Sequence, residues 1–185
     1  MKKHIFCESY FYSLFQAPNY KELTEFVNSK DEVYSDDRPW TNSCSVKTIS
    51  CKWEECLELL APSVSKFANS LEKSFSWSMQ DPWINCYQRG DYQEIHGHDG
   101  HDFSCVFFPE VKEDFSQFVF SHRYSNFLSN NWIRLLGADQ SLTSIDPPIK
   151  SGDIIFFPGS LLHGVTPHRS DDMRKTLSCN FDIRL

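Results

Sequence analysis

The sequence of 185 residues lacks the features that are typical of nucleic-acid-binding proteins and of membrane proteins. Its 18 Lys and Arg stand against 25 Asp and Glu, and the two signs are interspersed, so no basic face for a phosphate backbone is indicated. No apolar run approaches the length that crosses a bilayer. These absences argue against nucleic acid or membrane as a partner, but they leave room for a small basic pocket inside an acidic protein.

Closely spaced cysteine pairs are also missing. Seven cysteines are spread along the chain without a CxxC motif, which argues against a thiolate zinc site. The first residues carry no pattern of a cleaved secretory signal. We therefore expect a soluble, cytoplasmic protein whose thiols are mostly buried in the core.

What the sequence does contain is a large supply of core-forming residues. Aromatic residues make up 15% of the chain, including sixteen Phe, and hydrophobic residues make up 40%. This composition predicts one folded domain over residues 1–185, without repeats or linkers. We expect residues 1–75 to form a strand and helical support, and residues 76–185 to form a β-rich core that carries the site.

The first part of the chain shows two helical patterns. Residues 4–15 are aromatic-rich and predict a strand, and residues 20–28 have apolar side chains at helical spacing. Residues 29–45 are polar and predict a loop. Residues 53–75 form the strongest helical region, in which Pro62 is expected to restart the helix at a first-turn position.

The second part changes to short alternating segments. Strands are predicted over residues 75–79, 83–87, 92–96, 103–108, 115–120, 154–157 and 175–183. Residues 126–136 could form an irregular insertion or a short helix. Helices followed by many short strands predict an α+β fold, an antiparallel barrel or sandwich with helices packed outside.

Three histidines are candidate metal ligands. His96 and His98 are two positions apart, so both side chains share one face if the strand continues through them. His163 follows a buried strand and a turn, among apolar neighbours. It can join the pair only if the fold brings distant strands side by side. Few protein ligands, with open positions for substrate and oxygen, are typical of an oxygenase iron site.

The last strand has one polar face. Alternation places Arg174, Thr176, Ser178 and Asn180 on one side of the strand. A guanidinium beside hydroxyl groups suits a carboxylate, because its planar fork donates two parallel charge-assisted hydrogen bonds. The same face could instead lie in solvent, with Arg174 in a surface ion pair.

The order and spacing of these motifs resemble the iron(II)- and 2-oxoglutarate-dependent dioxygenases of the prolyl-hydroxylase-like branch. Each motif is weak alone, and the resemblance covers roughly residues 80–182. The motifs that carry it are Trp83-Ile84-Asn85, His96-Gly97-His98, Ser104-Cys105-Val106-Phe107-Phe108, the segment from Gly152 to Phe157 with His163, and the segment from Arg174 to Asn180.

The resemblance implies a double-stranded β-helix (jelly-roll or cupin-like) core. It also implies Fe(II) as the metal and 2-oxoglutarate as the cosubstrate, with His96 and His163 as metal ligands. Arg174 would pair with the distal carboxylate of 2-oxoglutarate, helped by Thr176 or Ser178. By the same analogy, the remaining pocket residues are Tyr87, Asn85 and Asn180.

One position departs from the superfamily pattern. A carboxylate is expected where this chain has His98, so the site has either three histidine ligands, or Asp99 or Asp102 as the third ligand, or two protein ligands alone. Strand geometry favours His98, since Asp99 would point away.

The resemblance implies an enzyme, most simply a hydroxylase that couples oxidative decarboxylation of 2-oxoglutarate to C–H oxidation, of prolyl type or another. The alternatives are a cupin-type metal protein with three histidines and no 2-oxoglutarate dependence, and a non-catalytic binding module. The primary substrate, a peptide or a metabolite, is not specified by these residues.

Overall fold

Two antiparallel sheets face each other across a barrel in a computed structural model that describes residues 11–30, 46–71, 74–80, 82–121 and 144–184. The seven-stranded sheet has the order β1-β9-β6-β11-β4-β2, and β3 also pairs with β11. Its strands are β1 (Ser13–Gln16), β2 (Lys47–Ser50), β3 (Ser76–Met79), β4 (Trp83–Tyr87), β6 (Phe103–Phe108), β9 (Asp153–Pro158) and β11 (Arg174–Arg184).

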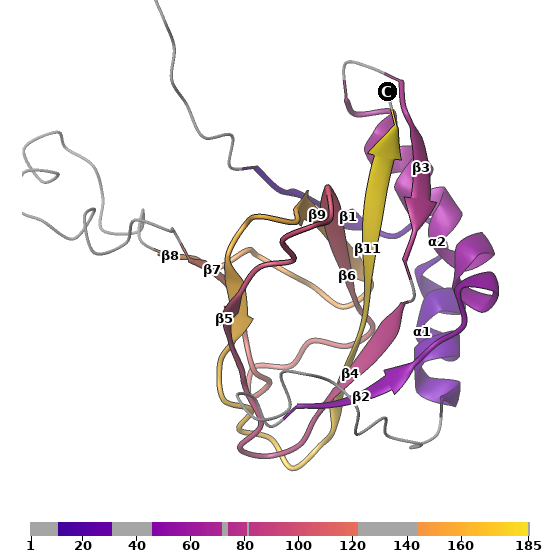
Figure 1. Cartoon of the computed structure of the whole chain (residues 1–185). Helices are drawn as coiled ribbons and strands as arrows, with labels where there is room; N and C mark the ends of the chain where they lie inside the picture. The colour runs from indigo at the N-terminus through magenta and orange to yellow at the C-terminus, as the bar shows by residue number, and fades with distance from the viewer. Residues whose placement is uncertain (1–10, 31–45, 72–73, 81, 122–143, 185) are drawn as a thin grey trace, which may run out of the picture.

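The smaller sheet closes the other side of the barrel (Figure 1). It has the order β5-β10-β7-β8, from the strands β5 (Gln93–His96), β7 (Phe118–Ser121), β8 (Ser144–Ile145) and β10 (His163–Val165). Neighbours in both sheets are mostly distant in sequence, which is the crossing pattern of a double-stranded β-helix. The expected fold class is therefore confirmed.

Two helices in the described ranges, α1 (Tyr20–Ser29) and α2 (Trp53–Ala68), cover the outer face of the larger sheet (Figure 1). Strict alternation along the strands divides the buried side chains between two cores. In β9, Ile154 and Phe156 pack toward the helices, whereas Ile155 and Phe157 face the barrel interior. The same alternation turns the polar face of β11 into the barrel, which is what places the site.

Several predicted elements differ in their bounds. The region 53–75 forms one continuous helix that ends at Ala68, with Pro62 inside it and not at a restart. Pro62 is exposed, so water can hydrate the helical carbonyl group that a proline nitrogen leaves without a donor. Strand β2 was not predicted, and β7 begins at Phe118, three residues later than expected. Residues 4–10 of the strand predicted over residues 4–15, and the insertion or short helix predicted over residues 126–136, lie outside the described ranges.

The cysteine side chains agree with the expected buried thiols. In the described part of the chain, five cysteines are buried: Cys51, Cys56, Cys86, Cys105 and Cys179. Burial raises the pKa of the Cys105 thiol above its ordinary value, so it stays protonated. Among the described residues, no helix is both long and apolar enough for a membrane span.

Candidate functional site

The three predicted histidines converge at one end of the barrel. The candidate ligand atoms of His96, His98 and His163 all lie within 4.8 Å of one another. His96 ends β5 and is the register partner of His163 on β10, so their ring centroids are 4.3 Å apart. The antiparallel pairing of β5 and β10, which are distant in sequence, therefore brings His163 next to His96.

The hydrogen bonds of two rings define which nitrogen could hold a metal. His96 Nδ1 lies 2.8 Å from the Glu94 carbonyl oxygen, and His163 Nδ1 lies 2.9 Å from the Leu161 carbonyl oxygen. A carbonyl oxygen accepts and cannot donate, so each Nδ1 carries the proton. Each Nε2 then keeps a lone pair, and a backbone partner of this kind fixes the ring as a metal ligand requires.

His98 is held by a loop and not by the strand that was expected to carry it. Strand β5 ends at His96, and the His98 backbone N–H donates to the Gly159 carbonyl oxygen at 2.7 Å. The Gly159 N–H in turn donates to the Asp102 carbonyl oxygen at 3.0 Å. A Cβ atom at Gly159 would lie 2.3 Å from the His101 carbonyl oxygen, so the close approach of these two loops requires glycine.

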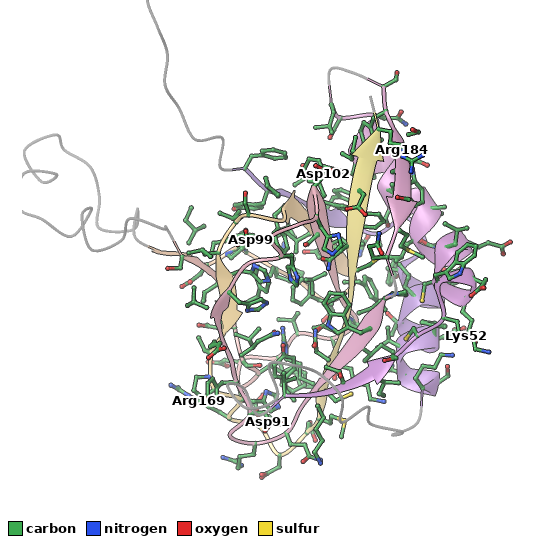
Figure 2. All side chains as sticks on the ribbon, in the orientation of Figure 1. Lys52, Asp91, Asp99, Asp102, Arg169 and Arg184 are labelled. Carbon is green, nitrogen blue, oxygen red and sulfur yellow. The ribbon has the colours of Figure 1, made fainter. Side chains whose placement is uncertain are left out.

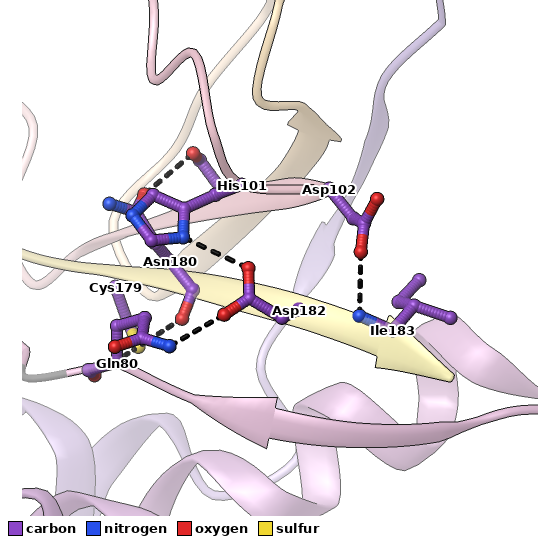
Figure 3. A network of polar contacts seen from close by, with 8 residues as sticks. Gln80, His101, Asp102, Cys179, Asn180, Asp182 and Ile183 are labelled. Atoms are coloured by element: carbon purple, nitrogen blue, oxygen red, sulfur yellow. Dashed lines mark hydrogen bonds and ion pairs between the residues drawn. The ribbon is translucent and has the colours of Figure 1, made fainter.

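The same loop is also tied to the end of β11 (Figure 3). His101 Nδ1 lies 3.0 Å from Asp182 Oδ1, and Gln80 also donates to that carboxylate. Both donors lower the pKa of Asp182 below its ordinary value, with the larger effect from His101. The loop that carries His98 is thus held by hydrogen bonds to two neighbouring segments, the β9–β10 corner and β11.

Neither of the two alternative carboxylates belongs to the histidine cluster. Asp99 is exposed, and the Asp102 carboxylate accepts a hydrogen bond from the Ile183 backbone N–H at 2.7 Å (Figures 2 and 3). Among the described residues, the three histidines form the one group with metal-ligand geometry.

Burial keeps the three imidazoles neutral. Desolvation, followed by the neighbouring histidines, lowers the pKa of His163 well below its ordinary value. The same causes lower the pKa of His98 to about 3. The rings of Phe118 and Phe157 lie 5.3 Å and 4.7 Å from the His163 ring, so this ligand sits in an apolar wall. Neutral imidazoles are the form that binds a metal ion.

Arg174 lies inside the barrel on the facing sheet. It is 3% exposed, and its guanidinium carbon is 4.7 Å from the Tyr87 ring centroid and 5.7 Å from that of Phe108. Burial lowers its pKa from the ordinary value, yet Nη1 has no hydrogen-bond partner within the described chain. A buried cation with an unpartnered donor fits an anionic ligand, because either feature alone is costly.

The other predicted pocket residues form a polar wall beside Arg174. Asn85 Nδ2 donates to Ser178 Oγ at 3.1 Å and reaches Thr176 Oγ1 at 3.5 Å. Asn180 Oδ1 accepts a hydrogen bond from Ser104 Oγ at 2.7 Å. Each of these side chains is buried and lines one pocket with the three histidines and Arg174. The expected inward orientation of the β11 face is therefore correct, and the solvent-facing alternative is wrong.

Gln93 is a pocket residue that sequence reasoning missed. Its Oε1 accepts a hydrogen bond from the Tyr87 hydroxyl at 3.0 Å, which links β5 to β4 across the barrel. Alternation would point Gln93 away from His96, three positions on. The register of β5 with β10 shifts between Gln93 and His96, and this irregularity lets both side chains face inward.

Solved structures with the same fold come from 2-oxoglutarate oxygenases. An oxidoreductase of the 2OG-Fe(II) oxygenase family from Burkholderia pseudomallei superposes with a TM-score of 0.63 and 14% identity, covering 92% of this chain and 84% of that chain. A prolyl-4-hydroxylase from Pseudomonas putida gives 0.62 and 16%, covering 96% and 95%. HygX from Streptomyces hygroscopicus, solved with nickel and 2-oxoglutarate bound, gives 0.61 and 8%, covering 92% and 82%. At these identities the likeness establishes the fold.

The family of this chain is identified by comparison of its sequence with known families. A comparison with curated proteins finds no match. Residues 81–180, just over half of the chain, match the family described as "Putative 2OG-Fe(II) oxygenase". This range contains all three clustered histidines and Arg174. The chain therefore belongs to the 2OG-Fe(II) oxygenase family, oxidoreductases that use Fe(II) and 2-oxoglutarate.

Proposed function

We propose that this protein is a hydroxylase in which His96, His98 and His163 hold Fe(II) and Arg174 binds the distal carboxylate of 2-oxoglutarate. The observation that carries the proposal is that a cation-binding group and an anion-binding group line one pocket. Three neutral imidazoles with metal-ligand geometry face a buried guanidinium whose Nη1 has no hydrogen-bond partner in the described chain. When bound, Fe(II) and 2-oxoglutarate would supply a C–H hydroxylation by dioxygen, in which one oxygen atom enters the substrate and the other enters the succinate that forms together with carbon dioxide.

The residues of this chain have distinct tasks in that reaction. The backbone carbonyl groups of Glu94 and Leu161 hold two imidazoles in the tautomer that leaves Nε2 available. Arg174 neutralises one carboxylate of the cosubstrate through charge-assisted hydrogen bonds. The Thr176 and Ser178 hydroxyl groups accept from Asn85, so each keeps its own proton for donation into the pocket.

Three histidine ligands leave the site one negative charge short of a site with two histidines and a carboxylate. Fe(II) bound by neutral imidazoles keeps its full positive charge toward the 2-oxo acid, which strengthens its attraction for that anion. The primary substrate is proposed to be a peptide or a metabolite. The likeness to a prolyl-4-hydroxylase over nearly the whole of both chains supports a prolyl-type substrate as the first to test. The buried cysteine thiols support a reducing, cytoplasmic location.

The proposal is tested by anaerobic titration of the Fe(II)-loaded protein with 2-oxoglutarate. We expect a weak visible absorption band that is lost in His163→Ala and kept in Asp99→Asn, a control at an exposed position in the same loop as His98. Aerobic addition of labelled 2-oxoglutarate should release labelled succinate, with peptides and metabolites screened for stimulation. Metal binding without the band and without succinate would contradict the proposal and favour a three-histidine metal protein of another activity.

The third ligand is tested by comparing His98→Asp with His98→Ala. If His98 is a ligand, the carboxylate of His98→Asp should restore the absorption band that His98→Ala weakens. Equal bands in both variants and the parent protein would show that His98 does not hold the metal.

A further inference from the structure

A second cavity lies on the far side of Arg174 from the histidine cluster. Its empty volume is about 910 Å³, compared with about 350 Å³ for the pocket that contains the histidines, and both volumes include space that is open to solvent. Arg174 and Phe118 line both cavities, so these two side chains form the wall between them. The proposed cosubstrate pocket is thus closed at its distal end by a flexible side chain with empty space behind it.

The guanidinium of Arg174 is only partly held at this wall. It hydrogen-bonds with the Tyr87 side chain. It forms no ion pair with any described carboxylate, and Nη1 has no hydrogen-bond partner. Its charged group lies near the rings of Tyr87 and Phe108. Contacts with ring faces are tolerant of small displacements, unlike a bidentate hydrogen-bonded pair. A small shift of the guanidinium toward the second cavity would therefore disturb the hydrogen bond with Tyr87 but would break no ion pair.

A second unpartnered donor lies in the lining of the second cavity. Ser116 is 6% exposed, and its Oγ is one of the four buried side-chain polar atoms that lack a hydrogen-bond partner in the described residues. Two of those four atoms, Ser116 Oγ and Arg174 Nη1, belong to residues that line this cavity. Much of the remaining lining is apolar, with Phe108, Phe115 and Ile149.

The charges around this cavity favour an extension of the first pocket over a separate anion site. Glu113 and Asp146 line it and are exposed, so they repel an anion that approaches from solvent. Lys112 also lines it, but its ammonium group already pairs with Asp172 at 2.8 Å. The anion that fits these donors is one that enters from the side of the histidines.

We propose that the pocket accepts a 2-oxo dicarboxylic acid that is longer than 2-oxoglutarate by one methylene group, such as 2-oxoadipate. This inference rests on the proposed function, because the 2-oxo end must bind the metal held by the histidines. The extra methylene lengthens the ligand by roughly 1.3 Å along its chain. Arg174 moves back by that amount into the second cavity, and Ser116 Oγ donates to the displaced carboxylate.

The test is an anaerobic binding titration of the Fe(II)-loaded full chain with 2-oxoglutarate and, separately, with 2-oxoadipate. The visible absorption band reports chelation by either acid without any turnover. We expect a Kd for 2-oxoadipate within tenfold of that for 2-oxoglutarate. Ser116→Ala should weaken 2-oxoadipate binding at least fivefold, while 2-oxoglutarate binding changes less than twofold.

Two further variants separate this role from general destabilisation. Ser63→Ala removes another buried, unpartnered hydroxyl group, in α2 outside the barrel, and should change neither titration. Ile149→Trp fills the second cavity and should weaken 2-oxoadipate selectively, with 2-oxoglutarate binding as the check that the protein is folded.

The outcomes distinguish this inference from the proposed function. A Kd for 2-oxoadipate more than tenfold above that for 2-oxoglutarate would overturn the inference alone. Equal weakening of both acids by Ser116→Ala would do the same. Failure of both acids to bind the Fe(II)-loaded parent protein would overturn the proposed function and this inference with it.

Discussion

At the scale of single residues, the site depends on burying ionisable side chains away from water. His163 is 3% exposed and is surrounded by aromatic rings, and Arg174 is equally buried on the opposite sheet. Such groups destabilise the metal-free protein, because burial removes them from water and they lack the ligands that would compensate. Binding of the proposed metal and anion therefore offsets a cost that the fold already carries.

This cost predicts acid sensitivity of the metal-free protein. The pKa of His98 is lowered to about 3, whereas an unfolded histidine titrates near 6.5. Below pH about 6.5 the unfolded state takes up a proton that the folded state does not, so stability falls as the pH falls toward the folded value. Each such histidine contributes at most about 1.4 kcal/mol per pH unit.

The measurement is urea unfolding in the presence of a chelator at pH 8, 6.5 and 5, where carboxylates remain mostly ionised. We expect the free energy of unfolding to decrease between pH 6.5 and pH 5. His98→Leu should show a shallower decrease, because one of the titrating groups is gone. An identical pH dependence in His98→Leu would show that His98 is not held neutral.

At the scale of elements, the site is positioned by how two loops meet. The loop from Gly97 to Asp102 and the corner at Gly159 exchange backbone hydrogen bonds, and backbone atoms of His98 and His101 lie against the position that a Cβ of Gly159 would take. Backbone atoms cannot move aside as the end of a flexible side chain can. The distance between His98 and His163 is therefore set by a contact that leaves no room for a side chain.

The substitution Gly159→Ala tests whether the close approach of these two loops sets the position of His98. Its methyl group would lie 2.3 Å from the His101 carbonyl oxygen and 2.9 Å from that of His98, so the two loops must separate. We expect a loss of about 1–3 kcal/mol in the free energy of unfolding, as for other overpacked sites, together with weaker binding of Co(II) as a spectroscopic substitute for Fe(II).

The control for that variant is Gly97→Ala in the facing loop. The nearest atom to a Cβ at Gly97 is 3.4 Å away, and its backbone does not have a positive φ. Stability and Co(II) binding should stay close to those of the parent protein. If Gly159→Ala behaves like Gly97→Ala, the close approach of the loops does not set the position of His98.

At the scale of the whole molecule, the proposed ligands connect the two sheets. His96 and His163 belong to the smaller sheet, whereas Arg174 belongs to the larger one. A cosubstrate that spans from the metal to Arg174 would bridge the barrel, next to the Tyr87–Gln93 hydrogen bond that already does so. Stabilisation by the acid should then require both the metal and the guanidinium.

Thermal unfolding tests this coupling. With metal present, 2-oxoglutarate at about 100 times its Kd should stabilise the fold by about 2.7 kcal/mol, which corresponds to a rise in Tm of roughly 5–10 °C. Arg174→Ala should lose most of this rise while keeping the rise caused by the metal alone. A full effect of 2-oxoglutarate in Arg174→Ala, or without metal, would contradict the bridging arrangement.

The sequence by itself determined the local features of this protein. Alternation grouped Arg174, Thr176, Ser178 and Asn180 on one polar face of β11, because side chains on a strand point to opposite faces whatever the strand packs against, although only the barrel decided that this face points inward. The segment of residues 103–108 that ends before Pro109 predicted the β6 strand at its observed bounds. The three histidines were recognisable as candidates from their residue type and spacing, and the order of the motifs identified the family.

Tertiary structure decided what local rules cannot express. The irregular register of β5 turns Gln93 toward the pocket, and the contact with Gly159 places His98 beyond the end of its strand. Pro62 stays inside one helix because packing of the buried face of α2 outweighs the local cost of the proline. The cavity behind Arg174 likewise arises from segments far apart in the chain. Each of these features depends on which distant backbone lies opposite, and that is fixed only when the whole barrel has formed.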